Sequence, residues 1–320
     1  MEPVLELRHL SKHYPEHRAV DEISLLIPRG AFYSLLGPSG CGKTTTLRLI
    51  AGFEPPTSGE VLLNGSSINH CRPYERNVST VFQNYALFPH MTVQQNVEFG
   101  LRRRQVADMT RRVRQVLELV ELTGKESRYP AQISGGERQR AALARSLVIQ
   151  PDVLLLDEPL AALDPRLRKQ MRSELKDLQR RVGITFLFVT HDQEEALSLS
   201  DRIAVMNQGR IEQAGTPVEV YLHPGTRFVA SFLGAINWID GVGIRPEATR
   251  ISRTATAAPI RSLPAAVSSC LFLGNCIQVE ARLFSGQAVI AEVSRLDAAF
   301  AVGESVHVWW NPSDELRLLR

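Results

Sequence analysis

Short apolar runs alternate with amphipathic stretches over the chain before residue 220. Residues 153–156 and 184–189 are apolar at nearly every position, which indicates strands buried on both faces of a sheet. Residues 4–7 and 23–27 also have the pattern of strands. Residues 166–182 place leucine and methionine at helical spacing, which predicts an amphipathic helix. Strands that alternate with helices predict a mostly parallel sheet with helices on both faces.

The pattern changes after about residue 236. Residues 276–283, 287–293 and 305–310 are short runs separated by turns that contain glycine and asparagine. Hydrophobic alternation with a period of two predicts strands with one buried face, and several such strands in a row predict a small all-β unit. We therefore predict an α/β domain over residues 1–236 and a small β-rich domain over residues 237–320.

A glycine-rich stretch over residues 37–44 lies between an apolar run and a helical pattern. It reads Gly-Pro-Ser-Gly-Cys-Gly-Lys-Thr and fits the phosphate-loop pattern G-x-x-x-x-G-K-[ST]. Glycine lets the backbone wrap closely around a phosphate, and the N–H groups of the loop and of the following helix favour an anion. Lys43 is then expected to reach the outer phosphates, and the Thr44 hydroxyl to bind Mg²⁺. The alternative is a plain glycine-rich turn.

Polar residues follow two of the predicted buried strands. Asp157 and Glu158 follow residues 153–156, and His191 follows residues 184–189. In an open α/β sheet the carboxyl edge carries the ligand site. Neighbouring side chains of a strand point to opposite sides, so one carboxylate is expected to order Mg²⁺ and the other to polarise an attacking water. The alternatives are an acidic strand-end cap and a structural histidine.

Two further features concern nucleotide binding. Ser134, Gly135 and Gly136 precede a helical pattern over residues 138–148, which predicts a second helix N-terminus that favours an anion. This segment has no phosphate-loop lysine, so it is not expected to hold a nucleotide alone. Tyr14 lies in a polar turn. Its ring is expected either to stack on an adenine ring or to be an ordinary half-buried tyrosine, and the sequence favours neither.

Composition indicates a soluble globular protein. The chain has 320 residues, is 44% hydrophobic and carries a net charge of +3, which is too small to argue for a nucleic-acid partner. No run approaches the roughly 18 apolar residues of a membrane-spanning helix. The four cysteines lack metal-ligand spacing and are predicted to be reduced thiols, with a disulfide between Cys270 and Cys276 as the alternative.

Taken in order, these motifs resemble those of the ATP-binding-cassette (ABC) ATPases over residues 4–236. The motifs are the phosphate loop, Gln83, Ile133-Ser134-Gly135-Gly136, Asp157-Glu158-Pro159, Ala162-Leu163-Asp164 and His191. Residues 167–171 and 189–197 are similar to the importer ATPases for polyamines, ferric iron, sulfate and maltodextrin, most closely to the spermidine/putrescine import ATPases. The tail resembles the transport-associated, oligonucleotide-binding-like (TOBE) domain of those importers through residues 244–247 and 309–312.

The resemblance implies a fold and a set of roles. The fold is a P-loop ABC cassette with a helical subdomain at about residues 84–150. Glu158 is the general base, His191 contacts the γ-phosphate, and Mg²⁺ is held by Thr44, Gln83 and Asp157, while Lys43 and Gln83 also support catalysis. Tyr14 stacks on adenine. The residues that bind the ATP phosphates are Gly37, Pro38, Ser39, Gly40, Cys41, Gly42, Lys43, Thr44 and Thr45.

The resemblance also implies partners. Ser134, Gly135 and Gly136 would bind the γ-phosphate of ATP held by a second copy in a head-to-tail dimer, and Asp164 would communicate across that interface. Residues 84–91 would contact a transmembrane permease. A solute-binding protein would deliver the solute to that permease. No nucleic acid is expected, and the protein would be peripheral at the cytoplasmic face of the cell membrane.

The sequence departs from the pattern of these importers in three places. Glu137 stands where they usually have glutamine, and Ala161 stands where they usually have serine. The tail is short for a TOBE domain, so its regulatory role is open. The rival functions are a soluble ABC ATPase that acts on DNA or ribosomes and a non-enzymatic nucleotide-binding regulator. Ferric iron, sulfate or another solute remains an alternative to polyamine.

Overall fold

The structure is a computed structural model that describes residues 2–255, 262–296, 300–316 and 318. The chain divides into two compact units, Met1–Pro217 and Val218–Arg320, which are described separately below.

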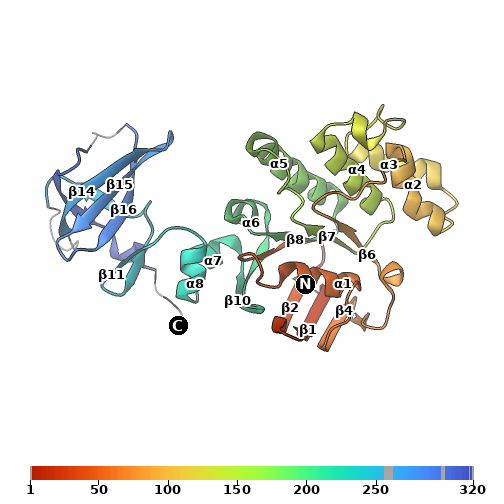
Figure 1. The fold of residues 1–320 in the computed structure, drawn as a ribbon, viewed down its shortest axis with the longest axis horizontal. Coiled ribbons are helices and arrows are strands. Elements are labelled where there is room, and N and C mark those ends of the chain that lie inside the picture. The colour runs from red at the N-terminus through yellow and green to blue at the C-terminus, as the bar shows by residue number, and fades with distance from the viewer. Residues whose placement is uncertain (1, 256–261, 297–299, 317, 319–320) are drawn as a thin grey trace. The chain divides into compact units, whose positions relative to one another are not determined.

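A six-stranded sheet forms the centre of the first unit (Figure 1). Its strand order is β10-β9-β3-β8-β7-β6, and all neighbouring pairs are parallel except β10 with β9. Every residue of β3 and β8 is buried, which explains their almost uniformly apolar sequences. The predicted, mostly parallel sheet is therefore confirmed. Its strands are β3 (Phe32–Leu36), β6 (Val78–Val81), β7 (Val153–Asp157), β8 (Thr185–Thr190), β9 (Arg202–Asn207) and β10 (Arg210–Gly215).

A four-stranded antiparallel sheet lies beside α1 (Lys43–Ala51) and has the order β2-β1-β4-β5. The first two strands run well beyond the predicted residues 4–7 and 23–27 because they pair with each other as a long hairpin. One apolar core joins this sheet and α1 to one face of the parallel sheet. The strands are β1 (Pro3–Tyr14), β2 (His17–Pro28), β4 (Ser58–Leu63) and β5 (Ser66–Ser67).

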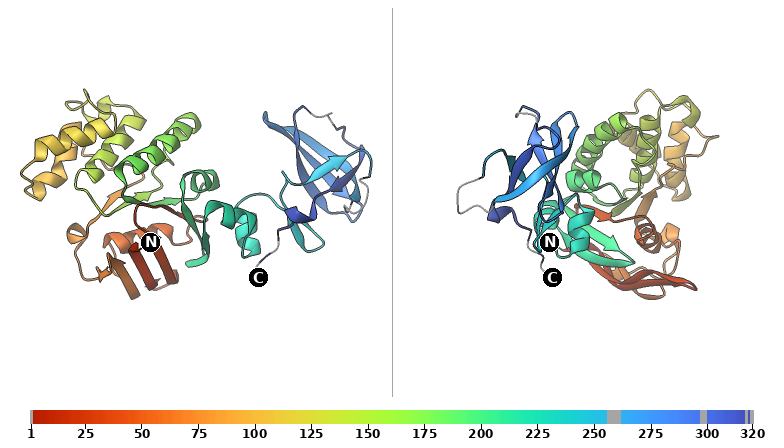
Figure 2. Two further views of the ribbon diagram at one scale, coloured as in Figure 1. Left: turned by 180° about the vertical axis from the view of Figure 1, so that it is seen from behind. Right: turned by 60° about the vertical axis from the view of Figure 1, so that its left-hand side comes forward.

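Helices pack on the other face of the parallel sheet around a second core, to which Phe32, Phe186 and Phe188 contribute. Figures 1 and 2 show α2, α3 and α4 gathered on that side, which confirms the predicted helical part of the fold. In the described ranges, no helix combines the length and the apolar character needed to cross a membrane. The helices are α2 (Val93–Arg103), α3 (Met109–Leu119), α4 (Gly135–Leu147), α5 (Pro165–Val182) and α6 (Gln193–Leu199), with short 3-10 turns at Pro73–Glu75 and Pro130–Gln132.

The second unit consists of two short helices and β-structure, and the alternating pattern predicts the β-structure. A five-stranded antiparallel sheet of order β13-β17-β14-β15-β16 encloses its own apolar core, and β11 and β12 form a hairpin. All four cysteines are free, so the alternative disulfide between Cys270 and Cys276 is wrong. The elements are α7 (Pro217–Leu222), α8 (Arg227–Phe232), β11 (Asn237–Ile239), β12 (Val242–Ile244), β13 (Arg250–Ser252), β14 (Ser262–Phe272), β15 (Cys276–Leu283), β16 (Ala288–Ser294), β17 (Ser305–Trp309) and a 3-10 turn at Pro312–Asp314.

The division between the compact units lies at residues 217/218, earlier than the predicted domain boundary at 236/237. Buried Arg245 gives a physical reason. Its guanidinium donates to the carbonyl oxygens of Ala230 at 3.0 Å and Tyr221 at 3.3 Å, and lies 4.1 Å from the Tyr221 ring centroid. These contacts attach α7 and α8 to the β-rich unit.

Candidate active site

The glycine-rich loop joins the buried strand β3 to α1, as its sequence context predicts. Gly42 has a φ of +104°, and a Cβ there would lie 2.2 Å from the carbonyl oxygen of Ala19. A Cβ on Gly37 would lie 2.3 Å from the carbonyl oxygen of Met206. Both distances are shorter than any real carbon–oxygen contact, so glycine is required where the loop approaches β2 and β9.

Lys43 brings a positive charge into this loop. Its side chain is buried, and Nζ donates to the carbonyl oxygens of Gly37 at 2.8 Å and Pro38 at 2.9 Å. It is also the first residue of α1, so the N–H groups of the first helical turn are nearby. An ammonium group beside a helix N-terminus makes the loop suited to a phosphate chain.

A hydroxyl and a carboxylate meet next to this loop. Thr44 Oγ1 donates to Asp157 Oδ1 at 3.1 Å, which connects the start of α1 to the end of β7. These are the oxygen ligands that Mg²⁺ takes in nucleotide sites. Among the described residues, no group of three or more histidine, cysteine, aspartate or glutamate side chains is placed to hold a metal ion by itself. The donor set fits an ion that takes its other ligands from phosphate and water.

Burial raises the pKa of Asp157, and the neighbouring Glu158 acts in the same direction. The ionised carboxylate is therefore less stable in the folded protein than in the unfolded chain. We expect Asp157→Asn to raise the free energy of unfolding at pH 7 by on the order of 1 kcal/mol, because the amide oxygen still accepts from Thr44 without a buried charge. Urea unfolding without nucleotide measures this gain.

The gain should disappear as the pH falls below the ordinary carboxyl pKa of about 4, where Asp157 is protonated in both states. Asp177→Asn, which changes an exposed aspartate on α5, is the matched control and should leave stability unchanged at every pH. An Asp157→Asn protein that is no more stable than wild type at pH 7 would contradict the prediction.

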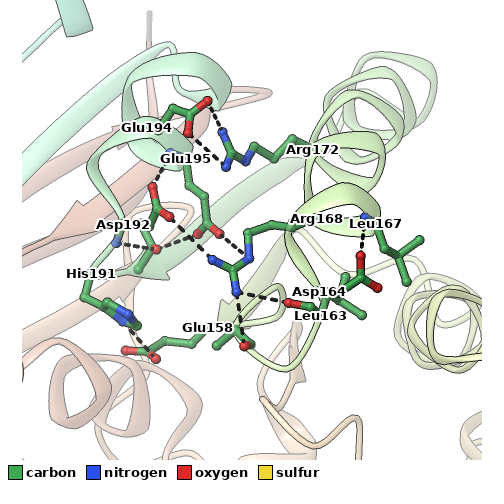
Figure 3. Close-up of polar contacts among 12 residues, drawn as sticks. Glu158, Leu163, Asp164, Leu167, Arg168, Arg172, His191, Asp192, Glu194 and Glu195 are labelled. Carbon is green, nitrogen blue, oxygen red and sulfur yellow. Dashed lines mark hydrogen bonds and ion pairs between the residues drawn. The ribbon is translucent and has the colours of Figure 1, made fainter. Parts of the chain in front are cut away.

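Glu158 and His191 meet at the same sheet edge. Strands β7 and β8 are parallel with Asp157 opposite Val189, so the residues that follow them leave the sheet side by side. Glu158 Oε2 lies 3.2 Å from His191 Nδ1 (Figure 3). Glu158 has a φ of +45°, unusual for a residue with a side chain, and its N–H donates to the carbonyl oxygen of Val189 at 3.0 Å. Strained backbone of this kind is typical of functional positions.

Three other predicted site residues are Gln83, Thr45 and Tyr14. Gln83 is exposed and follows β6, which pairs in parallel with β7, so it reaches the same edge. Thr45 is partly buried in the first turn of α1. Tyr14 ends β1 and is half-buried; its ring stacks on His17 with centroids 5.3 Å apart, and its hydroxyl donates to Glu54. The adenine-stacking role of Tyr14 therefore stays a prediction.

The Ser134–Gly136 segment begins α4, as predicted. Ser134 is the exposed N-cap, and its Oγ accepts from the backbone N–H of Glu137 at 3.2 Å. Glu137 Oε2 accepts from the Ser134 N–H at 2.7 Å, and these hydrogen bonds lower the pKa of Glu137. Glutamate at position 137 thus completes a capping box. The hydrogen bonds of Ser134 stay within its own helical turn, unlike those of Thr44, which join the phosphate loop to Asp157.

Comparison with protein families gives two matches. A family model described as ABC transporter matches residues 20–161, and one described as TOBE domain matches residues 242–318. The chain is 46% identical over 348 residues to a protein of Rubrobacter xylanophilus named spermidine/putrescine import ATP-binding protein PotA, with 96% of this chain and 91% of the relative covered. The chain belongs to the ABC transporter family of import ATP-binding proteins. The ATP-hydrolase class predicted from its motifs is thereby confirmed.

Other relatives of this ABC ATPase agree. A protein of Bacillus cereus with the same name is 44% identical over 326 residues, with 99% of this chain and 100% of the relative covered. The solved structure of cbiO1 from Clostridium perfringens, part of the ABC transporter complex cbiONQ, has a TM-score of 0.64 at 30% identity and covers 69% of this chain and 91% of its own. The solved structure of the ATP-binding cassette MJ0796 is a dimer in a post-hydrolysis state bound to ADP and Pi. It has a TM-score of 0.58 at 30% identity and covers 67% of this chain and 98% of its own.

The structure of this ABC ATPase also shows site residues that lie within the family-like runs 167–171 and 189–197 but received no individual role from the sequence. Arg168, Thr190 and Glu195 line a small cavity of about 60 Å³ together with Glu158 and His191. Arg168 looks like one of several arginines on an amphipathic helix, and Glu195 like a surface residue of a short helix. The packing of α5 against α6 brings Arg168 and Glu195 together, which no local pattern predicts, whereas Thr190 ends β8 directly before His191.

Proposed function

We propose that this chain is the ATP-hydrolysing subunit of an importer, and that the imported solute is a polyamine such as spermidine or putrescine. The observation that carries the hydrolytic assignment is the contact of Glu158 with His191 at the sheet edge where Thr44 meets Asp157. Polyamine follows from the names of the two PotA relatives, each of which aligns over nearly the whole chain.

In the proposed reaction, the loop residues 37–45 bind the phosphates of ATP through backbone N–H groups and Lys43. Glu158 accepts the proton of the attacking water, and His191 holds the Glu158 carboxylate in place and contacts the γ-phosphate. Thr44 and Asp157, with Gln83, would hold Mg²⁺, which neutralises charge on the phosphates when it is bound. The side chain of Tyr14 would stack on adenine.

The proposed active state is a head-to-tail dimer. Ser134 is exposed at the N-terminus of α4, where unpaired N–H groups and the helix dipole favour an anion. Gly135 and Gly136 let a phosphate approach the backbone. Asp164, the exposed N-cap of α5, would contact the second copy. ATP then favours the closed dimer because its γ-phosphate is bound by both chains.

Residues 84–91 support a permease partner. Arg145 donates to the carbonyl oxygens of Ala86 at 2.6 Å and Tyr85 at 2.8 Å, which fixes the run on the surface of α4. Phe53 and Phe82 nearby are exposed and form a ring pair, the kind of apolar surface that a partner covers. We propose that a permease docks here, that a solute-binding protein delivers the polyamine, and that the chain works at the cytoplasmic membrane face without nucleic acid.

Transport measured in the assembled importer tests this proposal. The chain is co-expressed with candidate permease and solute-binding proteins from the same organism, and uptake of radiolabelled spermidine, putrescine, ferric iron and sulfate is compared. We expect uptake of a polyamine that depends on ATP hydrolysis by this chain. Uptake of ferric iron or sulfate alone would show that the solute is not a polyamine, while the ATP-driven importer function would stand. ATP hydrolysis with no permease partner would contradict the importer function.

A further inference from the structure

Arg168 connects two segments that the proposed mechanism uses separately (Figure 3). On one side its Nη2 donates to the carbonyl oxygens of Leu163 at 3.1 Å and Ala161 at 3.4 Å. Leu163 directly precedes Asp164, and Ala161 lies three residues before it. Asp164 caps α5 by accepting from the N–H of Leu167 at 3.0 Å. The guanidinium therefore holds the short segment 161–164, which carries the exposed Asp164, against the first turn of α5.

On the other side Arg168 faces two carboxylates that follow His191. Nη1 lies 3.8 Å from Asp192 Oδ2, and Nε lies 3.9 Å from Glu195 Oε1. The Glu195 side chain is only 5% exposed, and burial raises its pKa, so the nearby cation matters for its charge. Glu195 Oε2 also accepts from Thr190 Oγ1 at 2.6 Å, which ties this carboxylate to the end of β8.

The two sides meet at the hydrolysis site itself. Arg168, Ala161, Asp192 and Glu195 line the same cavity of about 60 Å³ as Glu158 and His191. Arginine suits such a junction because its planar group presents five N–H donors in a fixed geometry. Here Nη2 donates to two carbonyl oxygens, while the carboxylates of Asp192 and Glu195 lie at ion-pair distance from the other two nitrogens. A displacement of segment 161–164 that moves the guanidinium therefore changes its distances to Asp192 and Glu195, the carboxylates that follow His191.

We propose that Arg168 is a positioning residue that couples the dimer-facing segment 161–164 to the His191 segment. Docking of a second copy against Asp164 then sets, through Arg168, the position of His191 and the carboxylate of Glu158 that it contacts. This inference rests on the proposed head-to-tail dimer. Arg168 acts through other residues and does not touch the reacting atoms.

The experiment compares Arg168→Gln with Arg172→Gln. Arg172 is one turn further along α5 and pairs with Glu194 on α6 at 2.8 Å, so its loss removes a similar ion pair without the contacts to 161–163. For Arg168→Gln we expect a kcat for ATP hydrolysis about tenfold lower and an unchanged KM for ATP, and for Arg172→Gln a kcat within about twofold of wild type. Introduced into a Glu158→Gln protein, Arg168→Gln should leave the ATP-dependent dimer intact.

Two outcomes would overturn the proposal. One is hydrolysis by Arg168→Gln within twofold of wild type, and the other is loss of the ATP-dependent dimer, which would make Arg168 part of the docking surface. Should Arg168→Gln fail to fold, Arg168→Lys is the second variant. Lysine keeps the positive charge beside Glu195 but lacks the planar guanidinium with several donors, so it should still lower kcat about threefold. A wild-type protein that neither hydrolyses ATP nor dimerises would contradict the proposed function instead.

Discussion

Glu158→Gln is expected to lower the kcat for ATP hydrolysis by about 10²–10⁴-fold while ATP still binds. Glutamine keeps the size of the side chain and an oxygen that can lie beside His191 Nδ1, but it cannot accept a proton from water. The phosphate loop, Thr44 and Asp157 are untouched, so nucleotide affinity should change little. Phosphate release measures the loss, and size-exclusion chromatography with ATP should show a stable dimer, because the γ-phosphate that joins the two chains is no longer removed.

Glu194→Gln is the matched control for that change. Glu194 is an exposed glutamate that pairs with Arg172, and it lies on α6 close to the same cavity without lining it. Its substitution should leave kcat within about twofold, as for other surface changes. Hydrolysis by Glu158→Gln at the wild-type rate would remove Glu158 from the role of general base and leave the contact with His191 as a structural one.

The central fold was predictable because its strands are buried on both faces. Apolar runs such as β7 and β8 have few other structural solutions, and their alternation with helices favours a parallel sheet. The limits of β1 and β2 were not predictable in the same way. Polar residues such as Lys12 and His17 lie within these strands, and hairpin pairing between the two segments extends them beyond the apolar residues.

The phosphate loop and the strand-end carboxylates could be located because their chemistry depends on neighbours in the sequence. Contacts between residues far apart in the sequence could not be predicted in this way. Tyr14 is bound by Glu54, and Arg168 by Glu195, through packing between elements that no local pattern specifies. The attachment of α7 and α8 to the β-rich unit through Arg245 is likewise a tertiary contact. The hydrophobic pattern does not reveal it, and the predicted boundary at 236/237 is therefore later than the observed division at 217/218.

Lys43→Ala is expected to weaken ATP binding about ten- to hundredfold, the range for losing a hydrogen bond to a charged group. Lys43 Nζ is buried and held by the carbonyl oxygens of Gly37 and Pro38, so the charge is positioned before nucleotide arrives. Alanine leaves the backbone amides of the loop but removes this charge. Isothermal titration with a non-hydrolysable ATP analogue measures the affinity directly, and KM for ATP should rise in parallel.

This result would separate binding from chemistry, because Glu158→Gln and Lys43→Ala should fail at different steps. The double variant should not form the ATP-dependent dimer at ATP concentrations that trap Glu158→Gln, since each copy must first hold its own nucleotide. Lys176→Ala is the control: it removes a largely buried lysine that pairs with Asp201 at 2.7 Å, and it should lower stability without changing ATP affinity. Unchanged affinity in Lys43→Ala would show that the loop amides alone bind the phosphates, and the head-to-tail site would then depend on the N-terminus of α4 for its positive potential.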